Sequence, residues 1–191
     1  NIMICVNISP ETKVGKIFSD DGENIIANIK GKNIKGNKKQ LYKKLYGKVT
    51  ISENGIIYLN PSVRRGIIPI FLMKYYKLRR EKKRLMIETK QKASVESDKN
   101  KKEALTLKAR NYDMVQNAYK ILLNATYGQM GNRYFSVFDV DNAEAVTLSG
   151  QRVIKESSKF VDEYMQQFIT DNNELLNYSG ATCYGDTDSI A

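Results

Sequence analysis

Two carboxylates one residue apart, Asp186 and Asp188, stand near the C-terminus in the run YGDTDS. Side chains at positions i and i+2 of a strand point to one side, and at the tip of a hairpin both can converge on a hard cation. With a further carboxylate, such a pair could hold two Mg²⁺ ions that clamp the attacking and leaving oxygens of a phosphoryl transfer. The alternative is turn chemistry, because aspartate favours turns for its own backbone contacts.

A second candidate site is a run of cations. Arg79 and Lys83 are one helical turn apart, within a cluster that also contains Arg80, Lys82 and Arg84. Five cations in six residues repel each other unless an anion is near. A planar guanidinium and a point-charge ammonium suit a triphosphate, because the first grips two oxygens and the second reaches another phosphate. A solvated basic helix is the alternative.

A third candidate is one face of a predicted helix. At 100° per residue, Lys120, Asn124 and Tyr127 fall on one side, together with Asp113, Gln116 and Asn117. Tyr127 is followed by Gly128, and a ring beside a residue without a side chain is a platform on which a nucleobase could pack. A solvent-exposed polar face is the alternative. The opposite arc is predicted to face the core and consists of Val115, Ala118, Ile121, Leu122 and Ala125.

The composition favours a polyanionic partner. The 191 residues include 31 Lys and Arg against 21 Asp and Glu, which gives a net charge of +10 and a pI near 9.4. There is no histidine, so catalysis by a histidine base is excluded. The two cysteines, Cys5 and Cys183, form no metal-binding or disulfide pattern, and no apolar run is long enough to span a membrane. We therefore expect a soluble, intracellular protein.

The first third of the sequence is rich in turn residues. Residues 41–46 have apolar positions at helical spacing before Gly47, which predicts a short helix. The runs KVTIS and IIYLN flank an Asn-Gly pair at 54–55, which predicts a β-hairpin.

Long helical patterns dominate from Gly66 onward. A helix is predicted through IFLMKYYKLRREKKRLMIETKQK, a turn over ASVESDKNKK, and a returning helix that stops at Gly128. RYFSVFDV is predicted to be a strand, after which Asp141 or Asn142 caps a third helix. That helix is predicted to bury one face, and ATCYG is predicted to be a closing strand. The buried face would comprise Ala143, Val146, Gly150, Val153, Ile154, Val161, Tyr164 and Phe168.

Taken together, these motifs resemble a known family. The run Lys120-x-x-x-Asn124-x-x-Tyr127-Gly128, followed by Tyr184-Gly-Asp-Thr-Asp-Ser189, resembles the second and third polymerase motifs of family B DNA polymerases. VNISPET resembles the segment after the family's first motif, ENGIIYL and GIIP the approach to the fingers, and LRREKK the first fingers helix. GNRYFSVFDVDNAEAVTLSGQ is most similar to the polymerases of T-even-type bacteriophages and related viruses. The resemblance is weakest over residues 13–50.

The resemblance implies a role for each candidate residue. Arg79, Lys83 and Lys120 match positions that hold the triphosphate of the incoming nucleotide. Lys120 is also expected to be a catalytic residue, together with Asp186 and Asp188. Asn124 matches a residue that shapes the nucleotide pocket, and Tyr127 and Gly128 match the floor on which the nascent base pair is checked. Asp188 matches a ligand of both catalytic Mg²⁺ ions, and Asp186 its less directly involved neighbour. One departure is Ala125, where the family usually has serine.

The predicted fold is α+β: an incomplete polymerase palm sheet with a long antiparallel helical hairpin, the fingers. Residues 1–65 and 132–191 would be palm segments and 66–131 the fingers, with the family's first motif before Asn1 and the thumb after Ala191. The implied reaction adds deoxynucleotides to a primer 3′ end, with primer-template DNA, deoxynucleoside triphosphates and a sliding clamp as partners.

By the same resemblance, the location would be the cytoplasm of an infected cell for a viral protein, and the isolated segment would be inactive. Two alternatives remain. One is a metal-dependent sugar-nucleotide transferase, since such enzymes also use Asp-x-Asp, and the other is a non-catalytic basic nucleic-acid-binding protein.

Overall fold

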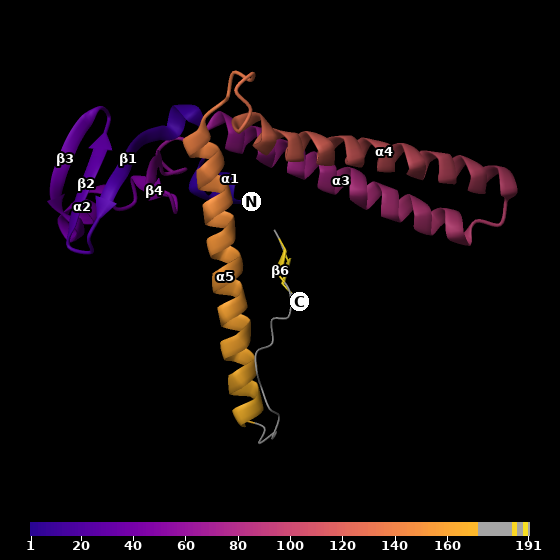
Figure 1. Ribbon diagram of the computed structural model, residues 1–191. Coiled ribbons are helices and arrows are strands. Elements are labelled where there is room, and N and C mark those ends of the chain that lie inside the picture. The colour runs from indigo at the N-terminus through magenta and orange to yellow at the C-terminus, as the bar shows by residue number, and fades with distance from the viewer. Residues whose placement is uncertain (172–184, 187–188, 191) are drawn as a thin grey trace.

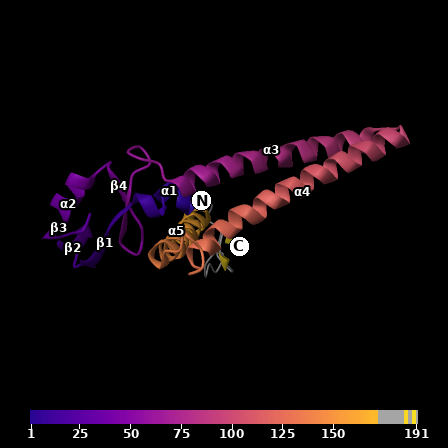
Figure 2. The same ribbon diagram turned by 90° about the horizontal axis from the view of Figure 1, so that it is seen from above.

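A computed structural model describes residues 1–171, 185–186 and 189–190 of the chain. It confirms the predicted α+β class, with an antiparallel sheet and three long helices. Two of these helices form a hairpin that projects away from the sheet, and the third leaves their junction in another direction, so that it is seen nearly end-on in the second view (Figures 1 and 2). Within the described residues, no helix combines the length and apolar character that a membrane span requires.

The sheet has five strands in the order β3-β2-β1-β5-β4, and all neighbouring pairs are antiparallel. The strands are β1 (Lys13–Asp20), β2 (Asn24–Ile29), β3 (Lys32–Asn37), β4 (Val49–Ile51) and β5 (Ile56–Leu59). The first three were not predicted, because Gly, Asn and Lys between the apolar residues suggested turns. Ile25 and Ala27 are nevertheless buried on one face, the two-residue alternation of a half-exposed sheet.

Two predicted elements of this region are confirmed. Strands β4 and β5 form the expected hairpin around Gly55, which has φ 76° and whose missing Cβ would lie 2.9 Å from the carbonyl oxygen of Ile17. A side chain does not fit there, so the Asn-Gly signal corresponds to a real steric need. The short helix is α2 (Lys38–Leu45), which begins after the Asn37 cap and is followed by Gly47 with φ 70°.

The predicted helical hairpin is also confirmed, with longer helices than expected. Helix α3 (Ile67–Val95) and helix α4 (Lys99–Met130) are joined by only residues 96–98. Asp98 caps α4, its Oδ1 accepting hydrogen bonds from the Asn100 and Lys101 amides at 2.9 and 3.1 Å. The prediction that Gly128 ends the helix was wrong. A glycine inside a helix costs only about 1 kcal/mol, and α4 continues to Met130, which is buried in the core.

The two helices pack along seams whose positions alternate three and four residues apart, which is the spacing of a coiled coil. The ring centroids of Tyr75 and Tyr119 lie 5.5 Å apart, and Lys82 lies 5.6 Å from the Tyr112 ring centroid. These contacts fix the antiparallel register of the hairpin. The seam residues are Ile68, Leu72, Tyr75, Arg79, Lys82, Met86, Thr89 and Ala93 on α3, and Ala109, Tyr112, Gln116, Tyr119, Leu123, Thr126 and Met130 on α4.

The predicted core arc of α4 was wrong. Ile121 is 69% exposed, and Val115, Ala118 and Ala125 are also exposed, whereas the polar Gln116 is buried in the seam. Counting the apolar residues along one arc of α4 predicted the wrong buried face. The seam also accepts polar side chains, because these find hydrogen-bond partners in the facing helix. Ala125, the departure from the family pattern, is thus on the surface of the described chain and not in its core.

The stretch after α4 was predicted to be a strand, and this was wrong. Residues 131–139 form successive turns, in which the Phe135 amide donates to the Asn132 carbonyl at 3.1 Å and the Phe138 amide to the Phe135 carbonyl at 3.0 Å. Alternating aromatic residues favour a strand only where a neighbouring strand pairs with it. Helix α5 (Val140–Asp171) then begins two or three residues earlier than expected, and Asp139, not Asp141 or Asn142, accepts the capping hydrogen bond from the Asn142 amide at 3.2 Å.

Only the beginning of α5 buries its predicted apolar face among the described residues. Of that face, Ala143 and Val146 pack against the core, whereas Val153 and Tyr164 are 53% and 61% exposed. Ala145, which the prediction did not include, is fully buried. The helix extends past the elements that cover its first turns (Figure 1). Near the C-terminus, β6 (Gly185–Asp186) pairs with β7 (Ser189–Ile190) beside α5. The rest of the predicted ATCYG strand lies outside the described residues.

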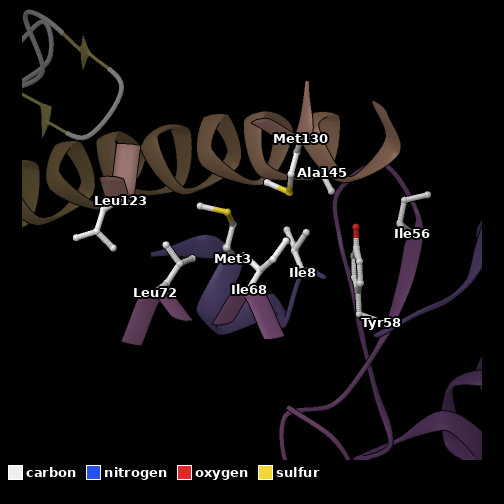
Figure 3. Packing of buried hydrophobic residues seen from close by; sticks show 9 residues of the cluster. All are labelled: Met3, Ile8, Ile56, Tyr58, Ile68, Leu72, Leu123, Met130 and Ala145. Atoms are coloured by element: carbon white, nitrogen blue, oxygen red, sulfur yellow. The ribbon is translucent and has the colours of Figure 1, made fainter. Parts of the chain in front are cut away.

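A shared core joins these parts. Helix α1 (Ile2–Val6) places Met3 against the seam residues of α3 and α4 and the start of α5. Figure 3 shows its side chain among those of Leu72, Leu123 and Met130. Ile56 and Tyr58 of β5 complete this cluster from the sheet side. The root of the hairpin, the sheet and α5 therefore share one set of apolar contacts.

A polar staple fixes the sheet to the start of α3. Asn7 is fully buried, and its amide donates to the carbonyls of Leu59 and Arg64 at 2.7 and 2.8 Å and accepts from the Gly66 amide at 2.8 Å. The short 3₁₀ helix η1 (Pro10–Thr12) follows, and the Thr12 hydroxyl donates back to the Asn7 carbonyl at 2.6 Å. The VNISPET segment thus holds the base of the hairpin by hydrogen bonds.

Candidate nucleotide-binding site

Most of the predicted nucleotide-binding residues lie on one side of the hairpin, facing α5. On α4, the hydroxyl of Tyr127 forms a 2.8 Å hydrogen bond with that of Thr147 on α5. Lys120 precedes Tyr127 by seven residues, which is two helical turns, and Asn124 lies between them, so all three share this side. On α3, Tyr76 lines a groove that α5 also lines, and Lys83 follows it by seven residues. Two helices therefore present these side chains toward the same space.

Arg79 occupies the seam between the two helices. It is half-buried, and its Nε lies 3.4 Å from the Gln116 side-chain oxygen, at the long limit for a hydrogen bond. The Gln116 amide donates in turn to Asp113 at 2.9 Å. These contacts orient the Arg79 guanidinium and leave its other N–H groups available to bind an anion. Sequence reasoning placed Gln116 and Asp113 on the polar face but missed this positioning role, which the three- and four-residue seam spacing could have indicated.

Lys83 and Lys120 are exposed, and neither they nor Arg79 forms an ion pair within the part of the chain that the structure describes. The register of the hairpin places Lys83 nearer its tip and Lys120 nearer its root, with Arg79 between them. At 1.5 Å per residue, Lys120 and Tyr127 are about 10 Å apart along α4. From the tip of the hairpin toward its root, the three cations therefore come before the Tyr127 ring.

Tyr127 and Gly128 stand at the root, beside a pocket of about 620 Å³ that Tyr134 and Phe138 also line. Tyr127 is 41% exposed, and its hydroxyl is fixed by Thr147. No atom lies within 4 Å of the Cβ that any other residue would have at position 128, so packing in the described chain does not require glycine there. The open space above Gly128 is available to a planar group.

A larger groove of about 970 Å³ runs between α1, α3 and α5. Its walls are mostly apolar, with Met73, Val146 and Ile154 among them, and Lys77 and Arg80 add positive charge from α3. Sequence reasoning counted Arg80 in the basic cluster but gave it no role. Lys77 and Arg80 are therefore two cations on the α5-facing side of α3, in addition to the predicted Lys83.

The predicted metal ligands lie near the C-terminus. The backbone of Asp186 belongs to β6 and pairs with Ser189 of β7, as a hairpin requires, and Asp188 lies outside the described residues. Among the described residues, no group of three or more acidic or cysteine side chains is close enough together to hold a metal ion. The donor chemistry of two carboxylates nevertheless fits Mg²⁺, which prefers oxygen ligands.

An ionic cluster that the sequence did not predict locks the sheet to α5. The Lys13 ammonium lies 3.0 Å from Asp139 and 2.8 Å from Asp141, and Lys16 lies 2.7 Å from Asp141. Hydrogen bonds from Lys13 and then Lys16 hold the pKa of the Asp141 carboxyl below its ordinary value. Burial works to lower the pKa of Lys13, but hydrogen bonds with Asp141 and Asp139 raise it overall. This cluster fixes the start of the helix that faces the candidate site.

Comparison with known proteins identifies the family of the chain. The family described as DNA polymerase family B matches residues 1–191. The chain is 37% identical over 71 residues to the DNA-directed DNA polymerase of Escherichia phage RB69 and 38% identical over 71 residues to that of Enterobacteria phage T4, in each case 37% of this chain and 7% of the relative. It is 31% identical over 126 residues to the DNA polymerase of Paramecium bursaria Chlorella virus NY2A, 66% of this chain and 11% of that protein. The matched regions thus span a small part of these relatives.

Proposed function

Because the chain belongs to DNA polymerase family B, we propose that it forms the fingers and part of the palm of a DNA-directed DNA polymerase. Residues 66–131 are the fingers in this proposal, and residues 1–65 and 132–191 are palm segments. The observation that supports it best is the α5-facing side of the hairpin, where Lys83, Lys120, Asn124 and Tyr127 follow one another in that order. Neither a sugar-nucleotide transferase nor a non-catalytic basic protein accounts for this order together with the family match.

In this proposal, the cations bind the triphosphate of the incoming deoxynucleotide. The guanidinium of Arg79, oriented by Gln116, grips phosphate oxygens, and the Lys83 and Lys120 ammonium groups neutralise the charge that accumulates during transfer. The order from Lys83 and Lys120 through Asn124 to Tyr127 follows the order of triphosphate, sugar and base in a nucleotide. Asn124 would limit the sugar side of the pocket, and Tyr127 with Gly128 would support the base pair.

Asp186 and Asp188 would hold divalent metal ions, with Asp188 as the main ligand. When bound, such ions supply electrostatic stabilisation of the transferring phosphoryl group. Primer-template DNA and deoxynucleoside triphosphates are the proposed substrates, and a sliding clamp is a proposed further partner. The isolated 191-residue chain is proposed to be inactive in primer extension.

Nucleotide binding by the 191-residue chain tests the proposal. We expect dATP to bind in isothermal titration, and the double variant Lys83→Gln/Lys120→Gln to bind it at least about tenfold more weakly, since hydrogen bonds to charged groups contribute about 1.5–3 kcal/mol each. Lys101→Gln/Lys108→Gln is the matched control, because both residues are exposed on α4 away from the Tyr127 side. Equal affinities of the two double variants would contradict the assignment. Deoxyadenosine, which lacks phosphates, should not distinguish them.

A further inference from the structure

A second strongly basic surface lies at the far end of the sheet from the hairpin (Figure 1). Residues 30–48, here called the basic lobe, comprise β3, α2 and the turns beside them. They contain eight lysines and no acidic residue, and therefore a charge of +8, compared with +10 for the whole chain. The basic lobe thus carries a large positive charge outside the proposed nucleotide site.

The lysines of the basic lobe are available to a ligand. Seven of the eight side chains are exposed, and Lys38 is half-buried and paired with Asp20 at 2.6 Å. None of the other seven forms an ion pair with any residue in the described part of the chain. Unpaired like charges so close in sequence repel one another, which disfavours the fold unless a polyanion is bound. This charge therefore points to an anionic partner.

Aromatic rings are interleaved with these cations. Tyr42 and Tyr46 are one helical turn apart at the end of α2, and Tyr46 is 88% exposed. Both line a groove of about 810 Å³, together with Lys43 on the helix and Val49 and Asn60 beneath. A groove of this size is large enough for a nucleotide. Exposed rings beside lysines are the combination by which proteins bind unpaired bases and their phosphates.

We propose that the basic lobe binds single-stranded DNA, with a base stacked on Tyr46 and the phosphates contacted by Lys39, Lys43, Lys44 and Lys48. Duplex DNA suits the lobe less well, because its bases are already stacked and cannot reach the ring. The choice of DNA over other nucleic acids rests on the proposed polymerase function. The charge and the rings do not depend on it, and the lobe is a separate surface from the Arg79 and Lys120 side of the hairpin.

A membrane surface is a less suitable partner for the lobe. The apolar residues of α2, Leu41 and Leu45, are half-buried and not free to enter a lipid layer. An interfacial helix needs an exposed apolar face opposite its cations, which α2 lacks. Vesicles that contain anionic lipid are therefore included in the test as an alternative ligand.

Fluorescence provides a direct test, because the chain contains no tryptophan. In the Tyr46→Trp variant, an oligothymidylate of about 12 nucleotides should quench the tryptophan emission as a base stacks on it. Phe160→Trp is the control, since Phe160 is 67% exposed but lies on α5. Quenching in the first variant alone supports the proposal. Equal quenching in both, or none in the first, overturns the stacking contact, as does quenching by anionic vesicles or by duplex DNA to the same extent.

Salt dependence tests the phosphate contacts. The affinity should fall less steeply with salt in the quadruple variant Lys39→Gln/Lys43→Gln/Lys44→Gln/Lys48→Gln. The negative slope of log affinity against log salt should become smaller in magnitude by about 3, since each contact to single-stranded DNA contributes about 0.7. The control removes the same charge from the exposed Lys99, Lys101, Lys102 and Lys108 of α4, and circular dichroism checks that both variants fold. Equal slopes overturn the proposal. Lys83→Gln/Lys120→Gln should leave the quenching of Tyr46→Trp unchanged. The test of the basic lobe and the test of the nucleotide site can therefore fail independently of each other.

Discussion

The Asn7 staple allows a quantitative prediction about what holds the hairpin to the sheet. In Asn7→Ala, the Leu59 and Arg64 carbonyls and the Gly66 amide lose their partner. Each buried group left without a hydrogen bond costs about 1–3 kcal/mol, and alanine at the left-handed φ of 66° adds about 1 kcal/mol. Allowing for partial relaxation, we expect a loss of about 3–6 kcal/mol in the free energy of unfolding.

Thermal unfolding followed by far-ultraviolet circular dichroism measures this loss. For a chain of this length, each kcal/mol lowers the Tm by about 2–4 °C, so the expected decrease is about 6–24 °C. Asn60→Ala is the control, because the Asn60 side chain accepts only exposed hydrogen bonds, from the Ser62 amide and hydroxyl, and the substitution keeps the backbone contacts. Asn7→Gly should recover about 1 kcal/mol relative to Asn7→Ala, since glycine tolerates positive φ. If Asn7→Ala and Asn60→Ala unfold at the same temperature, the buried hydrogen bonds of Asn7 do not stabilise the fold as expected.

Three further predictions concern the core, the ionic cluster and the metal ligands. Leu72→Ala should lower the free energy of unfolding by about 2–5 kcal/mol in urea denaturation, since Leu72 is fully buried, and a loss below about 1 kcal/mol would contradict its central place. Because Lys13 and Lys16 lower the pKa of Asp141, the stability that this carboxylate adds is complete above its ordinary pKa of 3.8 and is lost as the pH falls through the lower folded value. The stability advantage of the wild type over Asp141→Asn should therefore shrink in acid, and a constant difference would refute this. In a polymerase that contains this segment, Asp188→Ala should slow incorporation at least about a hundredfold without weakening primer-template binding, and activity within about tenfold of wild type would argue against its role.

The helical hairpin could be predicted from sequence because its signal is local. More than twenty residues without Gly or Pro, followed by a polar turn and a second such run, leave few alternatives to two antiparallel helices. The β4–β5 hairpin was predictable for the same reason, since Gly55 has a conformation that only glycine adopts easily. Local chemistry determines these elements before any tertiary contact forms.

The errors come from tertiary contacts that no local pattern records. The aromatic residues of 133–138 lack a neighbouring strand and form turns, and the Gln116 side chain is buried because Arg79 faces it across the seam. The strands β1 to β3 form because Ile25 and Ala27 reach a shared buried face. For the site, residue types and spacing indicated the α5-facing side of the hairpin, but the position of Arg79 in the seam required the register of two helices.

Single-turnover nucleotide incorporation by a polymerase that contains this segment shows whether Lys120 binds the triphosphate of the incoming nucleotide. The rate is measured against deoxynucleotide concentration for the wild type, Lys120→Gln and Lys108→Gln, with the last as a control on the same helix. We predict that Lys120→Gln needs at least about tenfold more nucleotide to reach half its maximal rate and has a lower maximal rate, because the ammonium stabilises charge that grows during transfer. Curves for Lys120→Gln and Lys108→Gln that coincide would contradict the account.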